Sequence, residues 1–450
     1  MGIRNNDIVP PPMSVASAKT QNASEVGLNR NQIRGFWAAW GGWALDGMDS
    51  FIYALVLVPS LRDLLPRSGI PATKGGIGFY GGLLFAVFLV GWGLAFLWGP
   101  VGDKFGRVRT LMMTIIWYSV FTFLSALVTN VSQLAVLRLL AGIGIGGEWA
   151  MGGTFVAEEW PESRRRAGAG YMHTGYYFGI FLAAILNYAI GSHFGHNGWR
   201  VMFAVGGLPA LLLAAVRHGV TEPARWKAKE RVVHSWALWQ PFAVLFSPSL
   251  RRRTILNALF MLASICGLWA GTVYVPSAVT TLAEAAGRIG PAAAQLASRA
   301  TMLVAFATIL GCLLMPWLAE RLGRRGALAF YFTLMLVFVG LTFGKVFYLG
   351  PSALPWLFVC LFFLGLGGAN FAVYTLWLPE QYPTECRASA FAFSTSFARF
   401  GGAGITFLVG AGVQHYGSLG IPVAMTALAF AVGLLLIPFG METRGQPLPA

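Results

Sequence analysis

The sequence predicts an all-α membrane protein with twelve transmembrane helices arranged as two six-helix repeats. Three observations support this fold class. Of the 450 residues, 56% are hydrophobic and only 11% carry a charge, whereas a soluble domain has about 25% charged residues. The apolar residues gather in long runs, and polar motifs of the first half recur in the second half. This composition excludes a soluble globular domain.

Twelve apolar runs are long enough to cross a bilayer, for which a helix needs roughly 20 mostly apolar residues. They lack the short alternating segments that are typical of barrel strands, so helices are expected throughout. The predicted spans cover residues 36–60, 78–101, 108–129, 131–157, 168–190, 199–217, 254–282, 297–319, 326–349, 353–378, 388–413 and 418–439.

Polar segments divide these spans into domains. The long basic segment 218–253 is predicted to be a cytoplasmic linker between an N-terminal half, 36–217, and a C-terminal half, 254–439. Residues 1–35 are polar and lack an apolar core, which favours a disordered cytoplasmic tail over a signal peptide. Residues 440–450 are expected to form a second cytoplasmic tail.

The net charge of +15 would suit a nucleic-acid-binding protein, but its distribution argues against one. Most Lys and Arg residues lie in tails and loops that the spans place on one side of the bilayer. This asymmetry follows the positive-inside rule and predicts that both termini are cytoplasmic. We therefore expect a multi-pass monomer in a plasma membrane, such as a bacterial inner membrane, with no nucleic acid as partner.

Two motifs recur in the two halves. AEEWPESRRRAGAG over 157–170 aligns with PEQYPTECRASAFA over 379–392. GPVGDKFGRVR within 99–109 has a counterpart in MPWLAERLGRR within 315–325, where Asp103 matches Glu320 and Gly106 matches Gly323. Parallel six-helix repeats are a transporter architecture, in which the solute binds between the halves near the membrane midplane.

Several motifs resemble those of one transporter family. Gly99-x-x-x-Asp103-Lys104-x-Gly106-Arg107 resembles the motif between helices 2 and 3 of the major facilitator superfamily, and Arg138-x-x-x-Gly142-x-Gly144-x-Gly146 resembles its helix-4 motif. The resemblance spans about residues 36–440. It implies the major facilitator fold and transport by alternating access.

Further motifs narrow the resemblance within this superfamily. Asp46-Gly47-Met48-Asp49, Gly147-Glu148-Trp149-Ala150 and Val156-Ala157-Glu158-Glu159-Trp160-Pro161 resemble the sialate:proton and related monocarboxylate symporters. The aromatic-acid:proton symporters are next closest and share the Asp-Gly-x-Asp element. The run His173-Thr174-Gly175-Tyr176-Tyr177 departs from the Gln-Ser-Gly-Trp type of sequence expected at that place.

Acidic residues in apolar runs are the candidates for proton coupling. An ionisable side chain at mid-membrane costs at least ~2.5 kcal/mol, and Asp46 and Asp49 share one helix face. Either one carries a proton or one only orients a neighbouring helix. Resemblance to proton-coupled sugar porters assigns Asp49 and Arg138 as the coupling pair, with a static packing bridge as the alternative. Glu148 is a second relay candidate or a structural hydrogen-bonding group.

Arg399 is the strong cation in the apolar runs of the second half. Its planar guanidinium suits a substrate carboxylate, although pairing with a protein acid or a helix-end carbonyl would also satisfy it. The other candidate substrate-binding residues are His173, Tyr177, Asn370 and Tyr374. A lone histidine in a helix can equally be a packing residue.

Charged residues at the predicted inner helix ends recur in both halves. We expect them to form a latch that closes the cytoplasmic side, because alternating access needs a bistable element. Orientation signals alone would explain the arginines but not the repeated acids. The predicted latch contains Asp103, Arg107, Glu158, Arg165, Glu320, Arg324, Glu380 and Arg387.

Together these features predict a secondary active transporter that takes up a small organic acid, a carboxylate, together with protons. The alternatives are a carrier for a neutral solute or sugar and a proton-driven exporter. A membrane enzyme would need a nucleophile–base set or metal ligands, and the six His and four Cys residues are scattered. The sequence has no nucleotide motif, so we expect no cofactor, no metal, and a proton gradient as the energy source.

Overall fold

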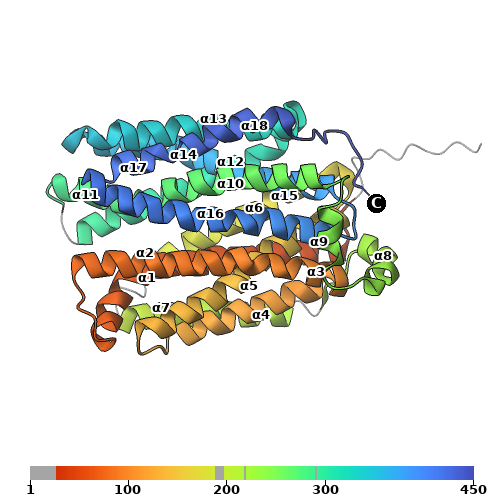
Figure 1. The fold of residues 1–450 in the computed structure, drawn as a ribbon, viewed down its shortest axis with the longest axis horizontal. Helices are drawn as coiled ribbons and strands as arrows, with labels where there is room; N and C mark the ends of the chain where they lie inside the picture. The colour runs from red at the N-terminus through yellow and green to blue at the C-terminus, as the bar shows by residue number, and fades with distance from the viewer. Residues whose placement is uncertain (1–26, 188–196, 217–218, 289–290, 450) are drawn as a thin grey trace, which may run out of the picture.

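The computed structural model describes residues 27–187, 197–216, 219–288 and 291–449. Most of the expected N-terminal tail, and Ala450 of the C-terminal tail, lie outside the described residues. Within the described ranges the regular structure is helical, which confirms the predicted all-α class (Figure 1).

Polar N-cap side chains mark the starts of three helices in the first half. Asn29 and Gln32 form a capping box at the first helix, while Thr73 and Asn130 cap later ones. The helices are α1 (Arg30–Arg67), α2 (Lys74–Leu94), α3 (Trp98–Phe105), α4 (Arg107–Ser125), α5 (Val131–Glu159), α6 (Glu162–Leu186) and α7 (Gly198–Val216), with a 3₁₀ turn, η1 (Ala95–Leu97), between α2 and α3.

Two short helices, α8 (Ala224–Ser235) and α9 (Gln240–Leu245), occupy the linker. The second half then contains α10 (Arg251–Val273), α11 (Val275–Ala285), α12 (Pro291–Arg321), α13 (Gly323–Gly344), α14 (Ala353–Gly368), α15 (Asn370–Trp377), α16 (Arg387–Tyr416), α17 (Gly420–Met425) and α18 (Leu428–Leu436). Short 3₁₀ turns complete it: η5 (Val346–Tyr348), η6 (Gly350–Ser352), η7 (Pro379–Gln381) and η8 (Ile437–Phe439).

Several predicted spans are broken helices. The span 254–282 changes helix at Tyr274, and 353–378 changes helix at Ala369. The first helix bends by 62° between Leu57 and Pro59, since proline cannot donate the helical hydrogen bond. Among the described residues, eight helices are long and apolar enough to span a membrane, or nine if the bent first helix counts as one span.

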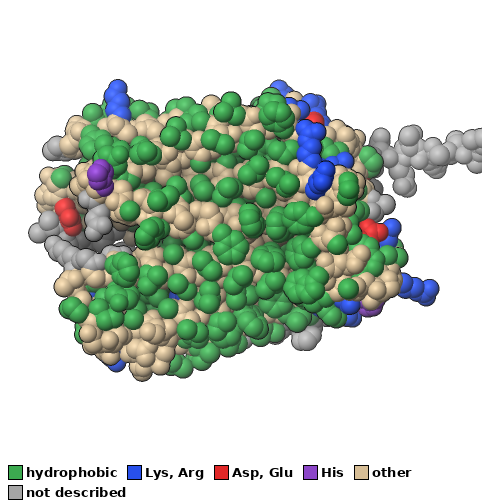
Figure 2. All heavy atoms as spheres, viewed as in Figure 1, with side chains coloured by type: hydrophobic (Ala, Val, Ile, Leu, Met, Phe, Trp, Pro, Cys, Tyr) green, Lys and Arg blue, Asp and Glu red, His purple; other side chains and the backbone are tan. Residues whose placement is uncertain are grey.

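The two halves lie side by side, with their long helices roughly parallel (Figure 1). Helix α16 packs against α2, α3 and α5, while α12 and α15 pack against α6. The linker helices lie at one end of the bundle, beside the C-terminal segment. Figure 2 shows hydrophobic side chains over the middle of this face and most of its visible Lys and Arg side chains near that same end. The interface between the halves positions the site described next.

Candidate functional site

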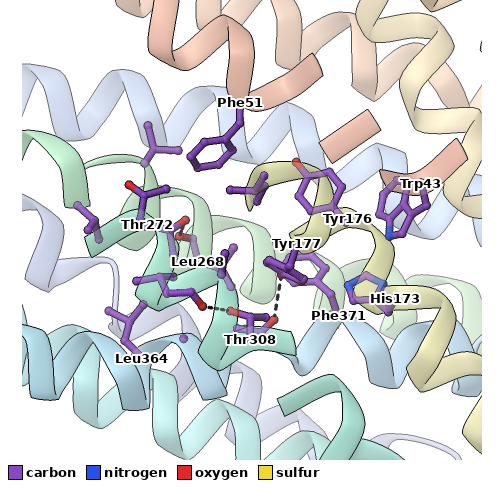
Figure 3. A pocket seen from close by; sticks show the side chains of 18 of the residues that line it. Trp43, Phe51, His173, Tyr176, Tyr177, Leu268, Thr272, Thr308, Leu364 and Phe371 are labelled. Atoms are coloured by element: carbon purple, nitrogen blue, oxygen red, sulfur yellow. Dashed lines mark hydrogen bonds between the residues drawn. The ribbon is translucent and has the colours of Figure 1, made fainter. Parts of the chain in front are cut away.

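A cavity of about 790 Å³, counting all unfilled space including the part open to solvent, lies between the two halves. Figure 3 shows aromatic side chains gathered on one side of it and Leu268, Thr272, Thr308 and Leu364 on the other. One cation, Arg399, belongs to the lining among the described residues. The rings that line it are Trp43, Phe51, Trp92, Trp149, His173, Tyr176, Tyr177 and Phe371.

The aromatic side is a connected cage. The ring centroids of Trp43 and Tyr176 are 4.8 Å apart, and those of Trp43 and Trp149 are 5.4 Å apart. His173 lies 5.2 Å from Trp149 and 5.9 Å from Tyr177. These spacings fall in the range of favourable aromatic pairs, so the rings support one another and present fixed walls to the cavity.

Glycines allow the helices that carry this cage to approach closely. A Cβ atom at Gly47 would lie 2.0 Å from the carbonyl oxygen of Tyr176, and one at Gly179 would lie 1.8 Å from that of Ala44. Only glycine therefore fits at these contacts between α1 and α6. The close packing brings Trp43 of α1 against Tyr176 of α6.

Arg399 reaches the cavity from α16 and is 2% exposed. Its guanidinium lies 3.9 Å from the centroid of the Trp92 ring, and one of its N–H groups donates to the Thr395 carbonyl. Its Nε has no hydrogen-bond partner. Within the described part of the chain, Arg399 forms no ion pair with a carboxylate. A buried cation without an acid partner is costly, and an anion in the cavity would relieve that cost.

Next to the aromatic rings, polar contacts with Thr375 connect the two halves. Trp149 Nε1 donates to Thr375 Oγ1 over 2.9 Å, and the same oxygen lies 3.4 Å from His173 Nδ1. Because an indole N–H can only donate, the Thr375 oxygen accepts there and its own proton is available to the imidazole. Two aromatic residues of the first half thus share one hydroxyl of α15.

Two predicted substrate-binding residues lie outside the cavity lining. The Asn370 amide donates to the carbonyls of Gly367 and Gly368, where α14 passes into α15. The Tyr374 hydroxyl lies 2.9 Å from that of Ser264 on α10. His173, Tyr177 and Arg399 do line the cavity. Trp43, Trp92 and Tyr176 also line the cavity but were not predicted from the sequence, although Trp43 precedes Asp46 by one helical turn and shares its face.

Asp49 and Arg138, the predicted proton-coupling pair, are buried and lie outside the cavity lining. Asp46 and Asp49 are both 0% exposed. Arg138 Nη1 lies 3.5 Å from Asp49 Oδ1, and Arg138 Nη2 donates to the hydroxyls of Thr122 and Ser125 at 3.2 and 2.9 Å. The structure therefore brings Asp49 and Arg138 together, and two hydroxyls of α4 share the guanidinium.

Tyr176 connects this region to the cavity. Its ring lines the cavity, and it interacts electrostatically with Asp46, Asp49 and Arg399. Glu148 is also buried, but it lies against α4, where the Thr114 hydroxyl is 3.4 Å from its carboxylate. Asp46, Asp49 and Glu148 are thus buried in the first half. Tyr176 both lines the cavity and interacts with the two aspartates.

At the linker end of the bundle, Glu158 joins the two halves. It accepts two hydrogen bonds from Arg107 of its own half, at 3.1 and 2.9 Å, and one from Arg387 of the other half at 2.8 Å. Asp103 pairs with Arg107 at 3.2 Å and accepts the backbone N–H groups of Ala388 and Ser389 at the start of α16. A carboxylate at a helix N-terminus is well placed electrostatically.

The second half repeats part of this arrangement. Arg324 pairs with Glu380 at 2.6 Å, as Arg107 does with Glu158. Glu320 instead pairs across the interface with Arg166 at 2.5 Å, and Arg166 is not among the residues of the predicted latch. Arg165 donates to the Ala157 carbonyl and interacts electrostatically with Glu380.

Two acids outside the predicted latch cap its helices. Glu222 accepts the backbone N–H groups of Arg107, Val108 and Arg109 at the start of α4, and Glu442 accepts that of Arg324 at the start of α13. Both acids follow the last helix of a half, a repeated position that could have signalled them.

Comparisons with known proteins agree with this architecture. The family model "Sugar (and other) transporter" matches residues 38–235. A protein of Cupriavidus pinatubonensis named as a probable 4-methylmuconolactone transporter is 29% identical, over 92% of this chain and 91% of its own. The sialic acid transporter of Escherichia coli is 24% identical, over 93% and 96%. A proton:xylose symporter structure superposes with a TM-score of 0.78 at 18% identity, covering 93% of this chain and 98% of its own.

Proposed function

We propose that this chain is a multi-pass metabolite transporter of the major facilitator superfamily and that it takes up a small organic acid together with protons. The proposal includes a plasma membrane location with both termini in the cytoplasm. The relatives named for transport of 4-methylmuconolactone and of sialic acid support an organic substrate of this kind.

The observation that carries the proposal is the unpaired cation in the cavity. Arg399 is buried against Trp92, keeps a free Nε, and forms no ion pair within the described residues. A carboxylate could accept two hydrogen bonds from such a planar group. A neutral solute would leave the buried charge uncompensated, so the cavity favours an anion.

The coupling site is proposed to be the Asp49–Arg138 pair, with Asp46 beside it. Protonation of Asp49 would remove the charge that Arg138 faces. A buried arginine left alone is usually strongly destabilising, but Thr122 and Ser125 still accept hydrogen bonds from this one. The rings of Phe203 and Tyr53 also lie 4.9 and 5.6 Å from its guanidinium carbon. These contacts make the protonated state of the pair accessible.

The ionic contacts at the linker end are proposed to be the latch of alternating access. Glu158–Arg387 and Arg166–Glu320 join the two halves, so this end opens only when both pairs separate. Arg107–Glu158 and Arg324–Glu380 lie within single halves and can hold the separated acids in place.

Uptake into proteoliposomes tests the proposal. With an imposed inward proton gradient, we expect a labelled organic acid to accumulate above its equilibrium level, and a proton ionophore to abolish the accumulation. The screened acids should include aromatic, hydroxylated and sugar acids. Gradient-independent uptake of a neutral sugar, with no acid transported, would contradict the proposal.

A further inference from the structure

The residues that line the cavity limit which organic acids can bind there. We propose that the substrate is a planar aromatic or conjugated monocarboxylate with few or no hydroxyl groups. This inference rests on the proposed function, because it assumes that the cavity between the halves receives the transported acid.

The walls on the aromatic side suit a flat, apolar ring. Trp43, Trp149 and Tyr176 form a contiguous surface in which Trp43 is 4.8 Å from Tyr176 and 5.4 Å from Trp149. The Trp43 and Trp149 rings are inclined by only 22° to each other. Rings stack on such surfaces with their faces offset or edge to face, whereas a puckered saturated ring makes fewer close contacts.

The polar groups of the lining are largely occupied by the protein itself. The hydroxyls of Thr272, Thr301 and Thr308 each donate to a carbonyl one turn earlier in their own helix. The Tyr177 hydroxyl donates to the Gly368 carbonyl, and the Trp149 indole donates to Thr375.

Few donors therefore remain for a substrate. Among the described lining residues, the buried donors without a hydrogen-bond partner are the Arg399 Nε, the Tyr176 hydroxyl and the Trp43 indole N–H. The oxygens of an acid with several hydroxyls would lose the hydrogen bonds that water donates to them and would find few donors in exchange, and each unpaired group lowers affinity by about tenfold. A flat hydrocarbon ring loses no such contacts.

The charge of the lining limits the substrate to one carboxylate. Arg399 is the lone cation among the described lining residues, and it sits at the edge of the cage, over Trp92. A carboxylate on Arg399 places the attached ring toward Trp149, whose centroid is 5.9 Å from the guanidinium carbon. A second carboxylate on the far side of the ring would be buried without a partner.

Binding of a matched set of acids to the purified full-length protein tests this inference. Benzoate is the probe, and three other acids are compared with it. Cyclohexanecarboxylate has a puckered saturated ring, quinate has such a ring with hydroxyl groups, and terephthalate has a second carboxylate. Titration calorimetry or tryptophan fluorescence should show benzoate binding at least tenfold more tightly than each of the others. Equal or tighter binding of quinate, cyclohexanecarboxylate or terephthalate would overturn the inference.

The outcome also separates this inference from the proposed function. Proton-driven uptake of a hydroxylated acid, with no binding of benzoate, would refute the inference alone. Absence of binding and uptake for all four acids and for sugar acids, in protein that melts cooperatively, would refute both.

A variant pair tests the aromatic contact. Trp43→Leu should weaken benzoate binding about tenfold while changing cyclohexanecarboxylate binding less than threefold, and Trp43→Phe should restore most of the benzoate affinity. Trp37→Leu is the matched control, because Trp37 is on the same helix but 58% exposed and outside the cavity lining. If Trp43→Leu weakened the binding of both acids equally, Trp43 would contribute only apolar contact area and not a stacking face. That result would contradict the inference.

Discussion

At the scale of single residues, Arg138 is held by more than its carboxylate partner. The hydroxyls of Thr122 and Ser125 and the rings of Tyr53 and Phe203 surround its guanidinium. Asp49, by contrast, faces it at 3.5 Å and is fully buried. The proposed role of Asp49 as a proton carrier requires the site to tolerate loss of this negative charge, and the hydroxyl and ring contacts of Arg138 would remain after Asp49 is protonated.

Asp49→Asn should separate proton coupling from transport itself. The amide keeps the size of the carboxylate but cannot ionise, so the variant should lose at least ~90% of gradient-driven acid accumulation. Exchange of labelled for unlabelled acid, which needs no net proton movement, should stay within about threefold of wild type. Uptake assays in proteoliposomes with and without internal acid measure both quantities, and full gradient-driven accumulation by the variant would rule out Asp49 as the coupling residue.

Arg399→Gln should raise the KM for the acid by at least about tenfold, because a truncated partner of a buried charge pair costs roughly 2–5 kcal/mol. Arg399→Lys should restore part of the affinity, since lysine supplies the charge without the planar fork. Arg321→Gln is the control, because Arg321 is exposed and lies over Trp317. An unchanged KM in Arg399→Gln would mean that the substrate carboxylate binds elsewhere.

The sequence makes some site residues conspicuous and hides others. Asp49, Arg138 and Arg399 stand out because charges are rare in apolar runs. Trp43 and Tyr176 do not, since 14% of the chain is aromatic and most such residues serve packing or the membrane interface. Only the folded arrangement shows that these two rings meet at the cavity.

At the scale of helices, α4 and α13 begin in the same way. Gly106 and Gly323 precede them with positive φ values of 107° and 76°, and Glu222 and Glu442 accept the first backbone N–H groups. A carboxylate there satisfies N–H groups that the helix leaves free and complements the helix dipole.

Removing such a cap should destabilise the protein. Glu222→Ala should cost about 1–2 kcal/mol, the size of a lost N-terminal cap, and Glu442→Ala a similar amount. Both should therefore lower the melting temperature in detergent relative to Glu284→Ala, whose side chain is exposed at the end of α11. A melting temperature for Glu222→Ala equal to that of Glu284→Ala would show that the cap contributes nothing.

The positions of the helices follow from hydropathy, but their breaks do not. Apolar runs predict where the chain crosses the membrane, since length and polarity decide this. The break at Ala369 between α14 and α15 depends on packing, and it turns Asn370 toward the carbonyls of Gly367 and Gly368. Asn370 and Tyr374 were predicted to bind substrate. They lie outside the cavity lining because their polar groups face neighbouring protein groups after the break.

At the scale of the whole molecule, the internal repeat explains the ionic pairs that form within each half. Alignment of the repeats matches Arg107 with Arg324 and Glu158 with Glu380, and each half forms the corresponding pair. The sequence could not show which pairs cross the interface. Those contacts, Glu158–Arg387 and Arg166–Glu320, depend on how the halves dock.

Arg387→Gln should shift the molecule toward a state open at the linker end. The substitution removes the charge that reaches Glu158 from the other half, so the distance between spin labels at exposed Arg109 and Leu322 should increase by several ångströms in a larger share of molecules. Arg325→Gln is the control, since Arg325 donates to Ile437 within its own half. An unchanged distance distribution in Arg387→Gln would exclude this contact from the latch.

The measurement that tests proton–acid symport most directly is acid-evoked proton movement in proteoliposomes. A pH-sensitive dye is trapped inside, a transported acid is added outside without an imposed gradient, and the signal of protein-free liposomes is subtracted to remove passive permeation of the acid. We predict acidification of the interior in proportion to the labelled acid that enters. Entry of the acid with no proton signal above protein-free liposomes would contradict proton-coupled uptake.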